Sequence, residues 1–356
     1  MRILTVIGNR PQFVKAAAVA EPLRAEHEEV LVHTGQHHDD ELSEIFFREL
    51  GVPRPARELG IAGGSNTSQT ARMLAALDGL VKEIAPDLVL VYGDTNSTLA
   101  GALAGAQAQV PVAHVEAGMR SFDRAMPEEV NRVLTDHVSS LLLCSSSTAV
   151  ANLARESAVG RVELVGDVMV DVALVFAERA RQRAGVLDEH RVAPGEFLLV
   201  TAHRAGTVDD PVRLARLVDL LLAMPGPLVF PLHPRTRARL TEAGLLEALE
   251  AADGVRLTPP LGYLDFTALL VHSRAVLTDS GGVQKEAYLA RVPCVTMRST
   301  TEWVETVDAG WNALVDLDAE AARAALQRPL PDAHPALYGD GDAGRRVAAA
   351  LKLSLQ

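Results

Sequence analysis

Cysteine is scarce in this chain, and its scarcity excludes a fold that depends on disulfides. Only two of the 356 residues are cysteine, Cys144 and Cys294, and each lies within an apolar run (LLLCSS and VPCVTM). We expect both to be buried free thiols, which favours a reducing compartment and therefore the cytoplasm. A chain of this length can bury large cores without covalent links, and its length is typical of two domains.

Long apolar segments and excess positive charge are also lacking. No stretch of about 18 apolar residues is free of charge, so no membrane span is expected. The first apolar run, residues 3–7, stops at Gly8 and does not have the form of a signal peptide. The net charge of −12 argues against a nucleic-acid partner, although a local group of cations can still bind a small anion. Lysine occurs at only four positions, and Lys15 is a candidate for such a group because it follows a glycine turn.

Several familiar motifs are missing as well. The chain has no Walker loop and no G-x-S-x-G. Residues 339–344 match G-x-G-x-x-G, but no predicted strand precedes them and only twelve residues follow, so they cannot open a dinucleotide-binding unit. The run His37-His38-Asp39-Asp40 has the composition of a metal site. Adjacent histidines point in different directions, so we interpret it as a polar loop.

Short apolar runs alternate with helical patterns along the chain. In the first half we expect helices at 12–26, 70–84 and 99–108, and strands at 3–7, 30–34, 88–92, 112–115 and 141–144. After a long connection the pattern resumes, with strands at 197–201, 228–232, 255–257, 275–278 and 294–297. Such alternation predicts an α/β protein with parallel sheets covered by helices on both faces. The final helix could pack on either half.

Polar residues follow the predicted strands at the ends where open α/β sheets bind ligands. A polar residue at one strand end is ordinary. Six with complementary chemistry, three from each half, indicate a cleft between two domains. They are Arg10, Asp94, Glu116, His203, His233 and Ser280.

The sharpest single motif is Asp-Ser-Gly-Gly at 279–282, between a predicted strand and a predicted helix. Gly281 and Gly282 let backbone N–H groups approach a ligand closely, and the helix dipole favours phosphate oxygens there. Glu286, one turn into the helix, could accept hydrogen bonds from ribose hydroxyls. The alternative is an ordinary turn with an Asp or Ser cap.

The first half offers an anion ligand and three carboxylates. Arg10, in the turn after the first strand, can hold a phosphate in a forked contact. Asp94, Glu116 and Glu128 provide the carboxylates, and a site that moves protons requires two that face each other. A single carboxylate at such a position is more often a helix cap or a surface charge. Glu128 follows Pro127 in a predicted first helical turn, where the helix dipole stabilises a carboxylate.

Motifs spread over nearly the whole chain resemble the non-hydrolysing UDP-N-acetylglucosamine 2-epimerase family. They include GNRPQFVK, VYGDTNSTLAG, HVEAGMRSFDRAMPEEVNR, TAHRAGTVDD, GYLDF and TDSGGVQKEA. The resemblance implies a GT-B fold with two Rossmann-like domains, 1–167 and 168–341, a central cleft, and a C-terminal helix within 342–356 that crosses back to the first domain. It also implies a homodimer, no nicotinamide cofactor and no obligatory metal.

The reaction implied by the resemblance is elimination followed by re-addition of UDP, and it inverts C2 of a UDP-2-acetamido sugar. The carboxylates implied as acid and base are Asp94, Glu116 and Glu128. The residues implied to stabilise the diphosphate or orient the sugar are Arg10, Lys15 and His203, and His233 is a further candidate in the cleft. The residues implied to hold phosphate and ribose are Ser280, Gly281, Gly282 and Glu286. The backbone of Leu261 and the side chain of Phe266 are implied to line the uracil site.

Three departures from the family pattern bear on these expectations. The common G-T-R-P-E reads G-N-R-P-Q here, with Gln12 last. The common T-E-R-P-E reads T-E-W-V-E, so Trp303 stands where an arginine is expected near the nucleotide. The segments around 41–44 and after Arg204 also differ from those that supply a second, activating UDP-sugar site in some bacterial members. We therefore predict no such allosteric site.

Four functions remain in competition. The leading hypothesis is conversion of UDP-GlcNAc to UDP-ManNAc for cell-surface polysaccharide. A second keeps the reaction but acts on UDP-2,3-diacetamido-2,3-dideoxyglucuronate, because Trp303, GNRPQ and GGVQKEA resemble relatives with that substrate. A GT-B glycosyltransferase is an alternative from another class, although a transferase has no need of three carboxylates to shuttle a proton at C2. A non-catalytic UDP-sugar-binding protein is the last.

Overall fold

The computed structural model describes residues 1–36, 54–183 and 185–352, except for the side chain of Arg10. The chain divides into two compact units, of which one holds Met1–Val172 with Tyr338–Gln356 and the other holds Ala173–Leu337. Each unit contains one sheet, and every strand pairing within both sheets is parallel. The α/β architecture with parallel sheets predicted from the sequence is therefore confirmed. None of the helices in the described ranges has the length and apolar character needed to cross a membrane.

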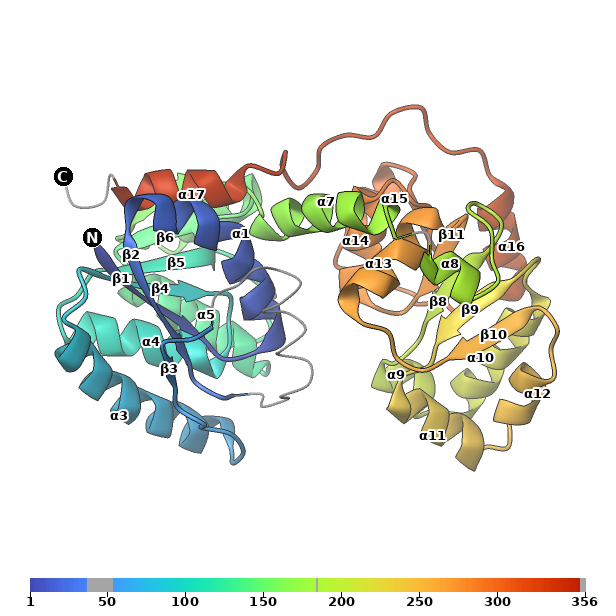
Figure 1. Ribbon diagram of the computed structural model, residues 1–356, viewed down its shortest axis with the longest axis horizontal. Helices are drawn as coiled ribbons and strands as arrows, with labels where there is room; N and C mark the ends of the chain where they lie inside the picture. The colour runs from blue at the N-terminus through green and yellow to red at the C-terminus, as the bar shows by residue number, and fades with distance from the viewer. Residues whose placement is uncertain (37–53, 184, 353–356) are drawn as a thin grey trace. The chain divides into compact units, whose positions relative to one another are not determined.

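The first unit has a seven-stranded sheet in the order β3-β2-β1-β4-β5-β6-β7 (Figure 1). The strands in chain order are β1 (Arg2–Ile7), β2 (Glu28–His33), β3 (Arg57–Glu58), β4 (Leu88–Tyr92), β5 (Val112–Ala117), β6 (Leu141–Cys144) and β7 (Arg161–Leu164). The helices are α1 (Arg10–Glu26), α3 (Asn66–Ile84), α4 (Asn96–Gln107), α5 (Pro127–Val138), α6 (Ser147–Arg155), the start of α7 (Val168–Arg181), and α17 (Ala343–Lys352). The order of the strands reverses between β1 and β4, which makes the loops after these two strands a topological switch point.

Alternation along the buried strands explains why helices cover both faces of this sheet. Ile3 and Ile7 of β1 belong to a core that includes Val347 of α17. Leu4 and Val6 belong to another core, which includes Leu77 of α3 and residues of α4. Successive side chains of a strand point to opposite faces, so one apolar strand supplies both cores. Figure 1 shows α1 and α17 on one side of the sheet and α3 and α4 on the other.

The C-terminal helix α17 packs against α1 in the first unit. The two helices approach so closely at Gly344 that an added Cβ would lie 2.1 Å from the carbonyl oxygen of Ala18. Asp171 of α7 accepts hydrogen bonds from the backbone N–H groups of Ala343 (3.2 Å) and Gly344 (2.8 Å). A carboxylate at this end of α17 satisfies N–H groups that have no partner within the helix.

The second unit has a six-stranded sheet in the order β10-β9-β8-β11-β12-β13. Its strands in chain order are β8 (Leu198–Thr201), β9 (Leu228–Pro231), β10 (Val255–Thr258), β11 (Ala275–Thr278), β12 (Cys294–Thr296) and β13 (Asn312–Leu314). After the end of α7, its helices are α8 (Gly185–Glu189), α9 (Ala205–Val208), α10 (Pro211–Ala223), α11 (Pro234–Glu242), α12 (Leu246–Glu250), α13 (Tyr263–His272), α14 (Gly281–Leu289), α15 (Val304–Asp308) and α16 (Ala319–Gln327). Here the switch point lies between β8 and β11.

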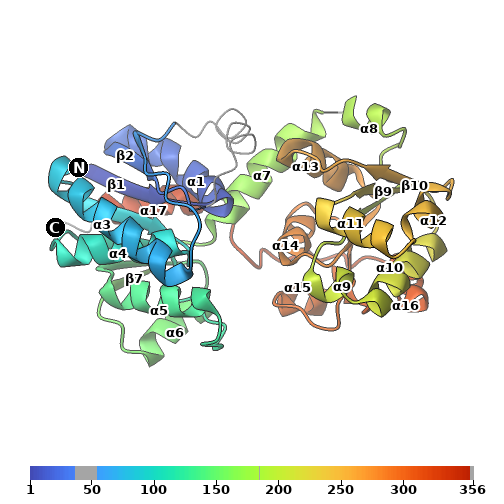
Figure 2. The same cartoon turned by 90° about the horizontal axis from the view of Figure 1, so that it is seen from below.

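This sheet is also buried on both faces. Leu198 and Val200 of β8 pack in one core with α10 and α16, which lie side by side (Figure 2). Leu199 belongs to the opposite core, with residues of α13 and α14. The two switch points therefore rest on strands buried on both faces, and Arg10, Asp94, His203 and Ser280 follow those strands.

Some boundaries differ from those predicted. Helix α4 begins three residues before the predicted start, because Thr95 and Thr98 form a reciprocal capping box. Strand β5 extends through Glu116 to Ala117 instead of ending at 115. The predicted His37-His38-Asp39-Asp40 loop and the segment 41–44 lie outside the described residues.

Candidate active site

An ion pair between α1 and β5 marks the switch point of the first unit. The ammonium of Lys15 donates to a carboxylate oxygen of Glu116, and the side chains are only 14% and 11% exposed. Gly93, directly after β4, lies against this pair. An added Cβ would be 3.1 Å from Nζ of Lys15 and 3.3 Å from Oε2 of Glu116, and its φ of +65° is itself in the left-handed region. Glycine is therefore favoured at this position by both the backbone conformation and the close approach.

Glu116 is held in a backbone conformation that is unusual for its type. Its φ is +71°, and the register between β5 and β6 shifts between Val115 and Ala117. Such irregularities redirect side chains and concentrate at functional sites, where the surrounding fold compensates for the strain. Here the irregularity places the Glu116 carboxylate beside Lys15.

Asp94 is held by α5 through both its side chain and its backbone. The guanidinium of Arg132 donates from Nη2 to the Asp94 carboxylate and from Nη1 to Oε2 of Glu129 (2.9 Å). The amide of Asn131 donates to the carbonyl oxygen of Asp94 (3.0 Å). Asp94 and Glu116 thus each pair with a cation from a different helix.

Glu128 and Glu129 are neighbours with opposite environments. Glu128, the predicted acid or base, is exposed in the first turn of α5, whereas Glu129 is 2% exposed. Glu129 accepts hydrogen bonds from the backbone N–H groups of Ser121 and Phe122, both at 2.9 Å. Burial by itself would raise the pKa of Glu129, but these hydrogen bonds and Arg132 hold it below its usual value. Glu129 therefore anchors the loop before α5 and leaves Glu128 accessible.

Gln12, which departs from the family pattern, joins the loops of β1 and β4. Its Oε1 accepts from the N–H of Gly8 (2.7 Å), and its Nε2 donates to the carbonyl of Tyr92 (2.7 Å) and to Oγ1 of Thr98 (2.9 Å). An amide can accept and donate at once, whereas an ionised glutamate can only accept. Gln12 is thus suited to its surroundings. The backbone of Arg10 begins α1, and its side chain lies outside the described part of the structure.

In the second unit, a buried carboxylate organises the loop after β8. Asp279 is fully buried and accepts hydrogen bonds from the backbone N–H groups of His203 (3.0 Å) and Arg204 (2.9 Å). The rings of His203 and His233 lie 5.8 Å apart. Burial lowers the pKa of His233, with contributions from His203 and Arg235. The two candidate histidines are therefore brought together, on loops that follow adjacent strands.

Charged groups surround the start of α14, where Ser280, Gly281 and Gly282 lie. A Cβ on Gly281 would be 2.2 Å from Oε1 of Glu302. Glu302 also accepts from Arg204 (3.2 Å) and Arg298 (2.9 Å). Burial opposes ionisation of Glu302, but a backbone hydrogen bond and these arginines leave its pKa below the usual value. The start of α14 thus lies beside a carboxylate that is paired with two guanidinium groups.

Trp303, the second departure, lies beneath a buried lysine. The ammonium of Lys285 is 5.0 Å from the centroid of the indole ring, which is within the range of a cation–π interaction. Lys285 is 7% exposed and lies in the helix that begins at Gly281. A cation is therefore present beside Trp303 even though no arginine occupies that position.

The remaining candidates lie in the loop before α13, on α13 and on α14. Leu261 and Phe266 are partly buried and pack against the same core cluster, and Glu286 is half-buried in α14. The structure places Arg10, Lys15, Asp94, Glu116 and Glu128 in the first unit, and His203, His233, Leu261, Phe266, Ser280, Gly281, Gly282 and Glu286 in the second. Sequence reasoning missed Glu129 and Arg132, although the spacing E-x-x-R on a helix is typical of an ion pair. It considered Asp279 only as a possible cap of an ordinary turn.

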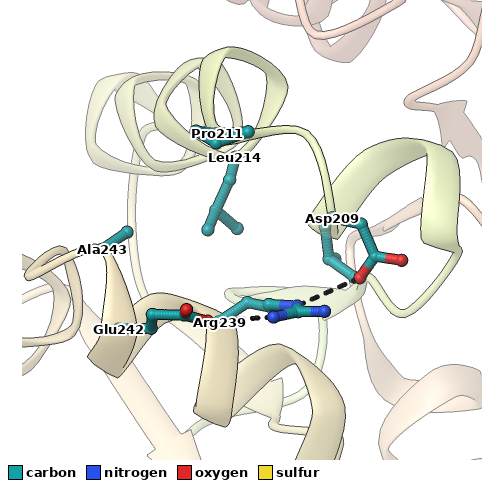
Figure 3. A pocket seen from close by; sticks show the side chains of 7 residues that line it. Asp209, Pro211, Leu214, Arg239, Glu242 and Ala243 are labelled. Atoms are coloured by element: carbon teal, nitrogen blue, oxygen red, sulfur yellow. Dashed lines mark hydrogen bonds and ion pairs between the residues drawn. The ribbon is translucent and has the colours of Figure 1, made fainter.

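A separate pocket lies between α9, α10 and α11 (Figure 3). Arg239 on its wall is paired with Asp209 and with Glu242. Arg235 also pairs with Asp209, and together with Arg239 it lowers the pKa of that carboxyl. The charges of both arginines are thus neutralised by neighbouring carboxylates, which disfavours binding of an anion in this pocket. Within the described ranges, no group of three or more His, Cys, Asp or Glu side chains is placed to hold a metal ion.

Comparison with known proteins gives matches along the whole chain. The family model for UDP-N-acetylglucosamine 2-epimerase matches residues 21–352. The UDP-2,3-diacetamido-2,3-dideoxy-D-glucuronate 2-epimerase of Pseudomonas aeruginosa is 47% identical over 363 residues, and a UDP-N-acetylglucosamine 2-epimerase homolog of Methanococcus maripaludis is 43% identical over 357 residues. Both alignments cover 99% of each chain. The structure of UDP-GlcNAc 2-epimerase from Methanocaldococcus jannaschii superposes with a TM-score of 0.89 at 36% identity, again over 99% of each chain. The same enzyme in complex with UDP-GlcNAc and UDP gives a TM-score of 0.83.

Proposed function

The chain belongs to the UDP-N-acetylglucosamine 2-epimerase family, and we propose that it inverts C2 of a UDP-linked 2-acetamido sugar, converting UDP-GlcNAc to UDP-ManNAc. The observation that carries this proposal is the arrangement at the switch point of the first unit. There Glu116, paired with Lys15, lies against Gly93, and Asp94 follows directly. Structural likeness over 99% of the chain to an epimerase solved with UDP-GlcNAc and UDP supports the same conclusion.

The reaction proceeds by elimination and re-addition. A carboxylate removes the proton from C2, and the bond between C1 and the UDP oxygen breaks, which leaves 2-acetamidoglucal and UDP. The UDP oxygen then adds back to C1, and a different group, acting as the acid, delivers a proton to the opposite face of C2. Asp94, Glu116 and the exposed Glu128 are the acid and base groups, and a group of this kind typically contributes about 10²–10⁴-fold to the rate.

The second unit binds the nucleotide. Backbone N–H groups at the start of α14, with Ser280, Gly281 and Gly282, bind the diphosphate, and the positive end of the helix dipole stabilises it as it leaves. Glu286 accepts hydrogen bonds from the ribose, and Leu261 and Phe266 contact the uracil. Arg10, Lys15 and His203 bind the diphosphate or orient the sugar, and His233 lies next to His203.

UDP-2,3-diacetamido-2,3-dideoxyglucuronate is the second candidate substrate. It is favoured by the 47% identity to the Pseudomonas aeruginosa enzyme that is named for this sugar, against 37% to the named UDP-N-acetylglucosamine 2-epimerase of Methanocaldococcus jannaschii. The uronate carries one more carboxylate than UDP-GlcNAc and therefore needs one more cationic partner.

A homodimer in the cytoplasm, serving polysaccharide synthesis, completes the proposal. Helix α5 exposes Val130 and Leu134, and the exposed Met126 directly precedes the helix, four residues before Val130. Phe122, in the loop before α5, is 71% exposed. Contiguous exposed apolar side chains of this kind are typical of a protein interface. We assign this face to a second copy of the chain, to be checked by light scattering of the wild type against Leu134→Glu.

The experiment that tests the function compares the two sugars directly. Purified protein is incubated separately with each UDP sugar, and the C2 epimers are quantified by proton NMR over time. A kcat/KM that is higher for UDP-GlcNAc than for the uronate supports UDP-GlcNAc as the substrate. Conversion of the uronate alone would make the uronate the substrate. Folded protein that binds UDP and epimerises neither sugar would contradict the proposed reaction.

A further inference from the structure

A buried histidine lies behind the carboxylates of the proposed active site. His114 is in β5, two residues before Glu116, and is fully buried. Its Nδ1 lies 2.7 Å from Oδ1 of Asp136, and its Nε2 lies 2.7 Å from the carbonyl oxygen of Gly93. A carbonyl oxygen can only accept, so Nε2 must carry a proton. An ionised carboxylate likewise only accepts, so an ionised Asp136 requires a proton on Nδ1 as well.

The surroundings of Asp136 favour its ionised form. Its other oxygen, Oδ2, accepts from the backbone N–H of Gly118 (3.0 Å) and from Nη1 of Arg120 (2.7 Å). The proton shared by Asp136 and His114 is therefore assigned to the histidine.

Arg120 further stabilises an ionised Asp136. Its side chain is 1% exposed and donates to both Asp136 and Glu156. A buried guanidinium requires a charged partner, and Asp136, which is 0% exposed, is its fully buried partner. An ionised Asp136 leaves the shared proton on His114.

We infer that His114 is a buried imidazolium that positions the Gly93–Asp94 turn and Glu116, and is thus a positioning residue for the proposed epimerisation. This inference rests on the proposed function for its catalytic consequence, although not for the protonation state. The imidazolium holds Gly93 by its carbonyl, and the Cα of Gly93 lies against the Lys15–Glu116 pair. Asp136 in turn holds Gly118, two residues after Glu116. One cation thus fixes the backbone on both sides of the catalytic carboxylates.

The protonation state is tested on the wild-type protein without any substitution of the cluster. Nitrogen-15 labelled histidine is observed by NMR at about pH 8, which is above the ordinary histidine pKa of about 6.5. The His114 signals are assigned by their absence from His114→Gln. We expect protons on both ring nitrogens of His114. A ring with an unprotonated Nδ1, which means that the proton lies on Asp136, would overturn the inference.

The positioning role is tested by kinetics. We expect Asp136→Asn, which removes the negative partner, to leave KM near that of the wild type and to lower kcat about 10–100-fold, the range found when a residue that orients reactive groups is lost. His137→Gln is the matched control, because His137 lies on the same helix and meets the cluster only at the partly exposed Glu156. It should stay within about twofold of wild type, as expected for a surface change.

The pH profile separates positioning from loss of fold. A merely destabilised Asp136→Asn protein would show less folded enzyme with an unchanged kcat per folded molecule and an unchanged profile, and this result would overturn the positioning role. We expect the kcat profile of the folded variant to shift instead. If the wild type epimerises no UDP sugar while the NMR shows the imidazolium, the proposed function fails and the protonation state stands.

Discussion

Lys15 and Glu116 form an ion pair across the backbone of Gly93, although 101 residues separate them in the chain. The pair exists because β1 and β5 flank β4 in the sheet, so the helix after β1 and the irregular end of β5 meet above the end of β4. Asp94 follows this point of contact and is paired with Arg132 from α5. The fold thus gathers two carboxylates, each with its own cation, at the ends of buried strands.

Replacing Lys15 by Met should reduce turnover. The change removes the partner that orients the Glu116 carboxylate, and misplacement of a reacting group by about 1 Å costs about 10²-fold in rate. Lys82→Met is the control, because Lys82 forms an exposed pair with Asp78 one turn away on α3. Steady-state kinetics should show a large fall in kcat for Lys15→Met and none for Lys82→Met. Equal activity of the two variants would show that the ion pair has no catalytic role.

Asp94→Asn should lower kcat by about 10²–10⁴-fold, the usual effect of losing an acid or base. Arg132→Met should also lower kcat, because Arg132 binds Asp94, and the effects of the two changes should be less than additive. Arg132→Met additionally leaves the buried Glu129 without its cation. Removing one partner of a buried pair costs about 3–5 kcal/mol, so we expect a lower midpoint of urea unfolding.

The matched control for this pair is Arg155→Met, an exposed arginine in the last turn of α6. It should change neither kcat nor the midpoint of unfolding. Strict additivity of Asp94→Asn and Arg132→Met in the double variant would contradict the claim that Arg132 acts through Asp94.

Gly281→Ala should weaken UDP binding. The new methyl group would lie 2.2 Å from Oε1 of Glu302, so this side chain must move away from Arg204 and Arg298. We expect the Kd for UDP to rise about tenfold, equivalent to about 1.4 kcal/mol, when measured by titration calorimetry. Gly79→Ala, in α3 with open space around the position, should bind UDP as the wild type does. An unchanged Kd for Gly281→Ala would remove the start of α14 from the binding site.

The two thiols should be unreactive in the native protein. Burial raises the pKa of both Cys144 and Cys294 to about 12, and the charge of Asp136 adds to the effect at Cys144. At about pH 8 a thiol with such a pKa is ionised to only about one part in ten thousand, and the thiolate is the reactive form. Labelling by iodoacetamide should therefore follow global unfolding, with both thiols reacting in denaturant. Rapid labelling of the native protein would contradict the burial of these residues.

The sequence predicts the strands and the residues that follow them well, for a physical reason. Buried parallel strands are short continuous apolar runs, and the polar residue at the end of each run is visible without any tertiary information. Asp94, Glu116, His203 and Ser280 could therefore be identified. Strands β3, β7 and β13 were missed, because they are short and carry polar or partly exposed residues.

The partners of the site residues could not be predicted in the same way. His114 and Asp136 meet through the packing of α5 on β5, and the apolar pattern of β5 gives no sign that its histidine is charged. Glu128 and Glu129 are adjacent and of the same type, and only the fold shows that Glu129 is the one buried against Ser121 and Phe122. Hydrogen-bond partners depend on distances between segments far apart in sequence, which a local pattern does not contain.

The most direct test of the account is proton NMR of the purified protein with UDP-GlcNAc in heavy water. Removal of a proton from C2 and its return from solvent predict UDP-ManNAc and UDP-GlcNAc that carry deuterium at C2, with less exchange in Asp94→Asn. Folded protein that binds UDP but leaves the C2 proton of UDP-GlcNAc and of the diacetamido uronate unexchanged would contradict epimerisation at this carbon.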